Sequence, residues 1–129
     1  MSQRVLLFGT FDDLHPGHRF VLDEARARGD VSVVVARDGT VLKIKGRAPL
    51  QSQDDRMQAI RDAYPDATVI PGDERDYMAS VRAVQPDLIL LGYDQQLPPG
   101  VTEADLLCPV ERLEAFEPHV HKSSLRRKI

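Results

Sequence analysis

Four short apolar runs constrain the fold of this chain most strongly. They are Val5-Leu6-Leu7-Phe8, residues 31–36, Thr68-Val69-Ile70 and Leu88-Ile89-Leu90-Leu91. In these runs apolar residues mostly follow one another instead of alternating with polar ones, a pattern typical of strands that are buried on both faces. Strands of that kind occur in parallel sheets covered by helices on both sides. The runs therefore predict a parallel β-sheet.

The segments between the runs have the period of amphipathic helices. In each of three sets, the residues share one face of their own predicted helix: His18, Val21, Leu22 and Ala25; Met57, Ile60, Ala63 and Tyr64; and Tyr77, Met78, Val81 and Val84. Capping residues followed by an acid three positions later indicate helix starts at Ser52, Asp73 and Thr102, the last being a short stub. We expect a weak fifth strand at 110–113 and a last helix from Ser123. This alternation predicts a doubly wound, five-stranded α/β fold with chemistry just after each strand.

Length and composition limit the classes of function. A chain of 129 residues with 42% hydrophobic and 29% charged residues is expected to form one domain over residues 1–129. Its net charge of −3 argues against sequence-independent nucleic-acid binding, which needs a basic surface. No signal-peptide pattern and no bilayer-length apolar run is found, so we predict a cytoplasmic protein with no membrane partner. Cys108 is the only cysteine, which excludes an internal disulfide, and we interpret it as an inert small residue.

The most informative segment follows the first predicted strand: Gly9-Thr10-Phe11-Asp12-Asp13-Leu14-His15-Pro16-Gly17-His18. Gly9 permits a turn, and Pro16 and Gly17 lie where the following helix begins. The free N–H groups and the positive dipole end of that helix form an anion site. The imidazoles of His15 and His18 lie beside it, where they can bind phosphate oxygens and stabilise the charge that develops on a phosphate under attack.

The histidine pair has other interpretations. Two histidines three residues apart also have the spacing of metal ligands, or can arise by chance on a helix. A zinc site normally needs a third ligand, and the only other histidines, His119 and His121, lie far along the chain. The glycine turn after a buried strand, followed by Pro-Gly and an amphipathic helix, favours phosphate chemistry. We therefore predict no metal site built from the protein's own side chains.

Gly9-Thr10-Phe11-Asp12 with Leu14-His15-Pro16-Gly17-His18 resembles the signature of the cytidylyltransferase-like nucleotidyltransferases. The resemblance extends over nearly the whole chain, and residues 35–41 and 91–95 are most similar to the archaeal-type FAD synthases. It implies a Rossmann-like sheet with strand order 3-2-1-4-5, and transfer of AMP from ATP to FMN to give FAD and pyrophosphate. Glycerol-3-phosphate cytidylyltransferase, which uses CTP and a small polyol phosphate, is the nearest alternative.

Basic residues after the second strand are expected to contact phosphates. Lys43, Lys45 and Arg47 form either a solvated basic loop or a flexible cationic lid. The resemblance implies contacts with nucleotide or acceptor phosphate, so we predict Lys43 as catalytic and Lys45 and Arg47 as phosphate- or acceptor-binding residues. Arg56 matches the arginine of the family's Glu-Gln-Arg pattern, here Asp54-Asp55-Arg56, and is predicted to bind the same groups. A salt bridge on the helix surface would explain Arg56 equally well.

The nucleotide is expected to contact three segments. The implied strand order brings the loop after strand four against the loop after strand one, so Asp94 would lie near the nucleotide, although aspartate is also common in turns. Ser123 and Ser124 match the family's Ser/Thr pair before the last helix, so the resemblance implies that they contact the triphosphate. Helix capping alone would explain one of the two serines. The predicted nucleotide-binding residues are Gly9, Thr10, Phe11, His15, Pro16, Gly17, His18, Asp94, His121, Ser123 and Ser124.

These assignments predict an in-line displacement. The acceptor phosphate attacks the α-phosphorus of the NTP, with His15 and His18 stabilising the transition state and a divalent ion, Mg²⁺, bridging the phosphates. The expected partners are small molecules, ATP or CTP and FMN or another phosphate monoester. Related enzymes are often dimers, which leaves a homodimer open. A non-catalytic nucleotide-binding regulatory module is the alternative of another class, and the complete histidine pair counts against it.

Overall fold

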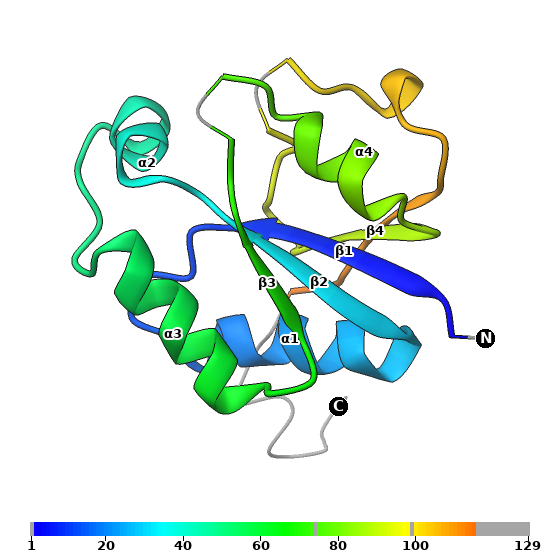
Figure 1. Ribbon diagram of the computed structural model, residues 1–129, viewed down its shortest axis with the longest axis horizontal. Coiled ribbons are helices and arrows are strands. Elements are labelled where there is room, and N and C mark those ends of the chain that lie inside the picture. The colour runs from blue at the N-terminus through cyan, green and yellow to red at the C-terminus, as the bar shows by residue number, and fades with distance from the viewer. Residues whose placement is uncertain (1, 74, 99, 116–129) are drawn as a thin grey trace.

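Parallel strands form a single sheet in the computed structural model, which describes residues 2–73, 75–98 and 100–115 (Figure 1). The strands are β1 (Arg4–Gly9), β2 (Asp30–Val35), β3 (Thr68–Pro71), β4 (Leu88–Leu91) and β5 (Val110–Arg112). They pair in the order β3-β2-β1-β4-β5, and every pairing is parallel. The doubly wound sheet and the strand order implied by the resemblance are thereby confirmed.

Helices cover both faces of this sheet (Figure 1). They are α1 (Pro16–Arg28), α2 (Asp38–Lys45), α3 (Gln53–Ala63) and α4 (Ala79–Val84), with a 3₁₀ turn, η1, at Glu103–Asp105. On one face α1 and α3 pack against alternate residues of β1, β2 and β4. On the other face α4 and the side chains of Leu97, Val101, Leu106 and Cys108 cover the intervening residues. All four residues of β4 are buried, as expected for a strand that is covered on both sides.

The predicted helix starts are confirmed in part. Ser52 caps α3, because its hydroxyl accepts the N–H of Asp55 at 3.1 Å, and Thr102 caps the η1 stub. The prediction of a helix start at Asp73 was wrong. The Asp73 carboxylate accepts the N–H groups of Arg75 and Asp76 and so closes a separate turn, and α4 begins only at Ala79. The predicted last helix from Ser123 lies outside the described residues.

Helix α2 was not predicted. The sequence interpretation placed the basic residues 43–47 in a loop or a flexible lid, and Gly39 and Thr40 are weak helix formers. The short helix buries Thr40 and Val41 and ends at Gly46, which adopts the left-handed conformation with φ of 77°. No helix among the described residues has the length and apolar character needed to cross a membrane.

Candidate active site

A large cavity opens at the carboxyl ends of the strands. Its volume is about 680 Å³, and the residues that line it come from the ends and following loops of β1, β2, β3 and β4. Strand β1 lies between β2 and β4, so the order of the strands reverses here, and ligands bind at such a switch point in doubly wound sheets. His15, His18, Lys45 and Asp94 are among the predicted site residues that the structure places around this cavity.

The loop after β1 folds into an unusual conformation. Phe11 and Asp13 both have φ of 53°, in the left-handed region that non-glycine residues rarely adopt. The Phe11 ring is buried beneath the turn, and a Cβ on Gly9 would lie 2.6 Å from that ring. Only glycine therefore fits at position 9 while Phe11 stays buried. This loop conformation places His15 at the N-cap position, immediately before α1.

His15 and His18 form a reciprocal cap at the start of α1. His15 Nδ1 accepts the N–H of Gly17 at 3.1 Å and of His18 at 3.4 Å, and His18 Nδ1 accepts the N–H of His15 at 3.3 Å. The two rings stack with centroids 3.6 Å apart and planes inclined by 19°. Because each Nδ1 accepts a hydrogen bond, each neutral ring carries its proton on Nε2. Two Nε2–H donors are thus available at the cavity wall.

This cap corrects the expected anion site. The sequence suggested free N–H groups at the start of α1, but those of Gly17 and His18 already donate to the His15 ring. The positive end of the helix dipole therefore acts on a ligand through the imidazole, because a ring that accepts hydrogen bonds at Nδ1 is a better donor at Nε2. The ring lies close above the helix start: a Cβ on Gly17 would be 3.0 Å from His15 Cε1.

The His18 ring is neutral at physiological pH. Burial, reinforced by the nearby His15 and Lys45, lowers its pKa from 6.5 to about 4, against the smaller opposing effect of Asp12 and Asp13. Protonation would also place a hydrogen on Nδ1 and break the bond with the His15 N–H. His18 therefore acts as a neutral hydrogen-bond donor and not as a cation.

We predict that His18 titrates near pH 4 in the folded protein, as measured by the pH dependence of its ring carbon and proton NMR shifts. Because the unfolded chain binds this proton more tightly, the stability linked to His18 is complete above pH 6.5 and is lost as the pH falls toward 4. Protein unfolded in urea is the control, since its histidines should titrate near the ordinary value of about 6.5. A folded-state pKa near 6.5 would contradict the neutral-donor role.

The loop after β1 is tied to the segment before α3. The Asp12 carboxylate accepts the N–H groups of Leu50 at 2.7 Å and Gln51 at 2.9 Å, and the Gln51 side chain accepts the N–H of Asp13 at 2.9 Å. Partial burial opposes ionisation of Asp12, but these two backbone bonds and the charges of Arg56 and Lys45 hold its pKa below 3.8. The loop conformation therefore depends on an ionised Asp12.

Arg56 lies beneath this loop and not in the cavity wall. Its side chain is 0% exposed, and it donates to Thr10 O at 2.8 Å, Gln51 O at 3.1 Å and Asp38 Oδ1 at 2.6 Å. Neither acceptor binding nor a salt bridge on the helix surface, the two alternatives from the sequence, describes this environment. Its guanidinium is committed to protein oxygens and supports the loop, and Arg56 does not line the cavity.

The structure places the basic residues Lys43, Lys45 and Arg47 in different surroundings. Lys43 and Lys45 lie in the last turn of α2, where residues two apart point to different sides of the helix. Lys45 lines the cavity, whereas Lys43 and Arg47 are exposed residues outside its lining. The charge of Lys45 acts on both His18 and Asp12. Lys45 therefore lies near the histidines, whereas Lys43, which was predicted as catalytic, does not line the cavity.

The loop after β4 forms the opposite wall. The Gln95 side chain donates to Phe8 O and accepts the N–H of Gly92 at 3.1 Å, which joins the ends of β1 and β4. Arg112 of β5 donates to the carbonyls of Gly92 and Gln95 and holds the same loop from the other side. Asp94, which these bonds present to the cavity, is exposed. The loop after β4 thus contributes the Asp94 carboxylate to the same cavity as the histidines.

Comparison with known proteins identifies the family. The family model described as cytidylyltransferase-like matches residues 6–118. The chain belongs to the cytidylyltransferase-like family. It is 38% identical over 126 residues to the FAD synthase of Methanopyrus kandleri, covering 91% of this chain and 83% of that protein. The FAD synthase of Thermoplasma acidophilum is 36% identical, with 97% of this chain and 92% of that protein covered.

A solved structure shares the fold of this cytidylyltransferase-like chain. The lipopolysaccharide core biosynthesis protein of Thermoplasma volcanium matches it with a TM-score of 0.78 and 33% sequence identity. The match covers 91% of this chain and the whole of that one, 100%. The resemblance identified from the first loop therefore extends to the arrangement of the entire sheet.

Several cavity residues of this cytidylyltransferase-like site were missed by sequence reasoning. They are Arg37, Thr40, Ile44, Asp73 and Tyr77. Arg37 comes two residues after the last residue of β2, and Asp73 two after that of β3, so the rule that chemistry follows each strand was sufficient to name them. Pro16 starts α1 but does not line the cavity. His121, Ser123 and Ser124 lie outside the described residues and stay predictions.

The structure gives no protein-built metal site within residues 2–73, 75–98 and 100–115: no three His, Cys, Asp or Glu side chains come together there.

Cys108 is partly buried, and burial followed by the charge of Asp87 raises the pKa of its thiol. A raised pKa disfavours the reactive thiolate, in agreement with an inert role.

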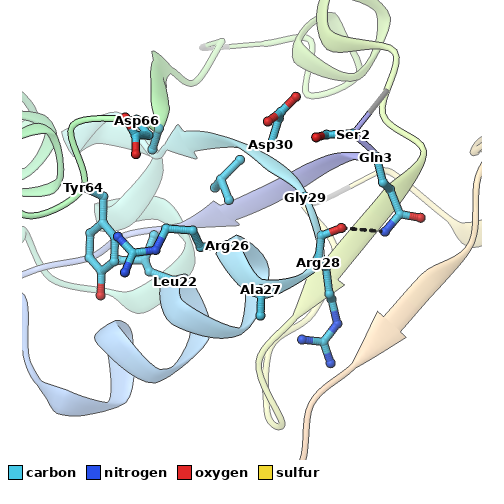
Figure 2. Close-up of a pocket in the computed structure, with 12 residues that line it drawn as sticks. Ser2, Gln3, Leu22, Arg26, Ala27, Arg28, Gly29, Asp30, Tyr64 and Asp66 are labelled. Carbon is cyan, nitrogen blue, oxygen red and sulfur yellow. Dashed lines mark hydrogen bonds between the residues drawn. The ribbon is translucent and has the colours of Figure 1, made fainter.

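A second cavity lies at the opposite end of the sheet, where the strands begin (Figure 2). Its volume is about 670 Å³. The Arg26 guanidinium lies 5.2 Å from the centroid of the Tyr64 ring, and Arg28 forms ion pairs with Glu24 and Glu111. These arginines already have partners, and none of the described residues that line this cavity is a histidine. His15 and His18 line the other cavity, at the carboxyl ends of the strands, which is therefore the candidate site.

Proposed function

We propose that this protein is an FMN adenylyltransferase, which transfers AMP from ATP to FMN and releases FAD and pyrophosphate. The observation that carries the proposal is the pair of Nε2–H donors of His15 and His18 at the helix start beside the cavity. It is supported by the identity of 38% and 36% to archaeal FAD synthases over almost the whole chain.

The chemistry that this geometry supports is a direct displacement. An oxygen of the FMN phosphate attacks the α-phosphorus of ATP, a new P–O–P bond forms, and the bond to the β-phosphate oxygen breaks as pyrophosphate leaves. Charge builds up on the oxygens of the α-phosphate during attack, and the His15 and His18 Nε2–H groups would donate to them. Fixed donors aimed at developing charge are the largest single contribution in many such sites.

The remaining cavity residues would hold the two substrates. Lys45, beside the histidines, would bind phosphate oxygens of the nucleotide, and Asp94 would accept hydrogen bonds from its ribose hydroxyls. His121, Ser123 and Ser124 are assigned to the pyrophosphate end by the family resemblance. The cavity also contains apolar side chains, among them Val34, Ile44 and Tyr77, which suit a flavin ring better than a glycerol chain.

A divalent ion completes this proposal. The carboxylate of Asp94 is an oxygen donor of the kind that Mg²⁺ prefers, and it faces the cavity. The described residues offer no full protein ligand set, so the ion would be bound mainly through the phosphates of ATP. When bound, Mg²⁺ neutralises phosphate charge and steadies the leaving pyrophosphate.

The proposal predicts that the protein with Mg²⁺, ATP and FMN forms FAD and one equivalent of pyrophosphate, measured by chromatography of the flavins and a coupled pyrophosphate assay. CTP with glycerol 3-phosphate serves as the parallel arm. FAD formation with ATP, and no flavin–cytidine dinucleotide when CTP replaces ATP, would support the adenylyltransferase. CDP-glycerol in place of FAD would reassign the substrates within the same chemistry. No pyrophosphate in either arm would contradict the proposal and favour a non-catalytic nucleotide-binding module.

A further inference from the structure

Arg37 occupies a fixed place next to the loop after β1. It follows β2 directly after Ala36, whose N–H donates to Gly9 O at 2.9 Å, so the backbone here lies against the turn that precedes the histidines. Arg37 is the residue before α2, and its side chain crosses to the end of β3, where Nε donates to Gly72 O at 2.5 Å. Two neighbouring strand ends therefore position this guanidinium.

The outer part of the guanidinium remains available to a ligand. Nε is committed to Gly72, but within the described ranges Nη1 and Nη2 have no hydrogen bond or ion pair to the protein. The nearby charge that acts with Arg37 belongs to Asp73, a partly exposed carboxylate held mainly by the N–H groups of Asp76 and Arg75. Arg37 lines the cavity. A guanidinium pinned at Nε with its two Nη groups unpaired is a preorganised fork for a phosphate.

The positions of the cavity cations separate two subsites. Among the described residues that line the cavity, the cationic ones are Lys45 and Arg37. The charge of Lys45 acts on His18, so Lys45 lies on the side of the histidines. Arg37 lies on the β2–β3 side of β1, whereas Asp94 follows β4 on the other side. The proposed reaction brings two phosphate-bearing substrates together, so a second cation apart from Lys45 has a phosphate to bind.

Building on the proposed function, we propose that Arg37 binds the phosphate monoester of the acceptor through Nη1 and Nη2 and so selects a phosphorylated acceptor. It holds oxygens that are not transferred while the attacking oxygen faces the α-phosphorus beside the histidines. The exposed side chain of Ile44, on α2 at the same side, contributes an apolar wall for the remainder of the acceptor. Sequence reasoning had assigned the acceptor phosphate to Lys45, Arg47 and Arg56.

The test compares FMN with riboflavin, which has the same ring and ribityl chain but no phosphate. A charged hydrogen bond is worth about 1.5–3 kcal/mol, so we expect Arg37→Gln to raise the KM for FMN by roughly 10- to 150-fold. The KM for ATP should change less than about twofold. In titrations followed by flavin fluorescence, FMN affinity should fall by a similar factor while riboflavin affinity stays at the wild-type value. Arg37→Lys should recover part of the loss.

Arg61→Gln is the matched control, because it removes the same charge from an exposed position on α3 away from the cavity. Equal losses for FMN and riboflavin in Arg37→Gln, or a raised KM for ATP with FMN unaffected, would overturn the inference. Unchanged FMN binding and KM would overturn it too. Failure of the proposed function is seen separately, as wild-type protein that forms no FAD.

Discussion

Replacing His18 by alanine is expected to lower kcat for FAD formation by about 100- to 1,000-fold, the range measured when one preorganised donor is removed from a developing oxyanion. The physical reason is the loss of the Nε2–H donor that the neutral ring presents to the α-phosphate. Because His18 is neutral, the loss should be nearly constant from pH 6 to 8 and should not follow an imidazole titration. The measurement is the rate of FAD formation at saturating ATP and FMN.

Alanine at this position also removes the cap on the His15 N–H, so a second variant is needed to separate the two roles. In His18→Asn the side-chain oxygen can replace Nδ1 as the acceptor, but nothing replaces the Nε2–H donor. We expect His18→Asn to lose kcat as severely as His18→Ala while keeping more of the thermal stability. A kcat for His18→Asn near the wild-type value would show that the ring matters only as a helix cap.

Much of the fold was predictable because burial leaves a clear signal in the sequence. The continuous apolar runs became β1 to β4, since strands covered on both faces have no polar positions. The α2 helix left no such signal, because it is short and buries only Thr40 and Val41. The start of α4 was also misplaced: an aspartate followed by an acid three residues later caps a helix or an isolated turn, and only tertiary packing distinguishes them.

The candidate site was predictable where chemistry depends on local spacing. The His15–Pro16–Gly17–His18 segment contains both histidines and the helix start, so the sequence alone brings them together. Long cationic side chains are different, because their roles depend on which way each one points. Lys43 and Lys45 point to different sides because residues 38–45 form the α2 helix, which the sequence interpretation did not predict. Arg37 follows a strand and lies in the matched segment 35–41, but the sequence does not show that its side chain lines the cavity.

Arg56 shows the same limit, and it gives the largest predicted effect on stability. Arg56→Met keeps the volume of the side chain but removes every donor, leaving Thr10 O and Gln51 O without their partner in the interior. Removing one member of a buried charged network costs about 3–5 kcal/mol, which is a large share of the 5–15 kcal/mol that stabilises a typical domain. We therefore expect a lower urea midpoint with an unchanged slope, followed by circular dichroism.

The matched control is Arg61→Met, on the same helix but exposed, for which a change within about 0.5 kcal/mol is expected. Asp38→Asn tests the ion pair separately and should cost less than Arg56→Met, because the Asp38 side chain is 52% exposed and water can solvate it. The Arg56 variant should also lose kcat, since Thr10 lies in the loop that places the histidines. A stability equal to that of Arg61→Met would mean that relaxed backbone or water satisfies both carbonyls, and Arg56 would then not be what positions the loop.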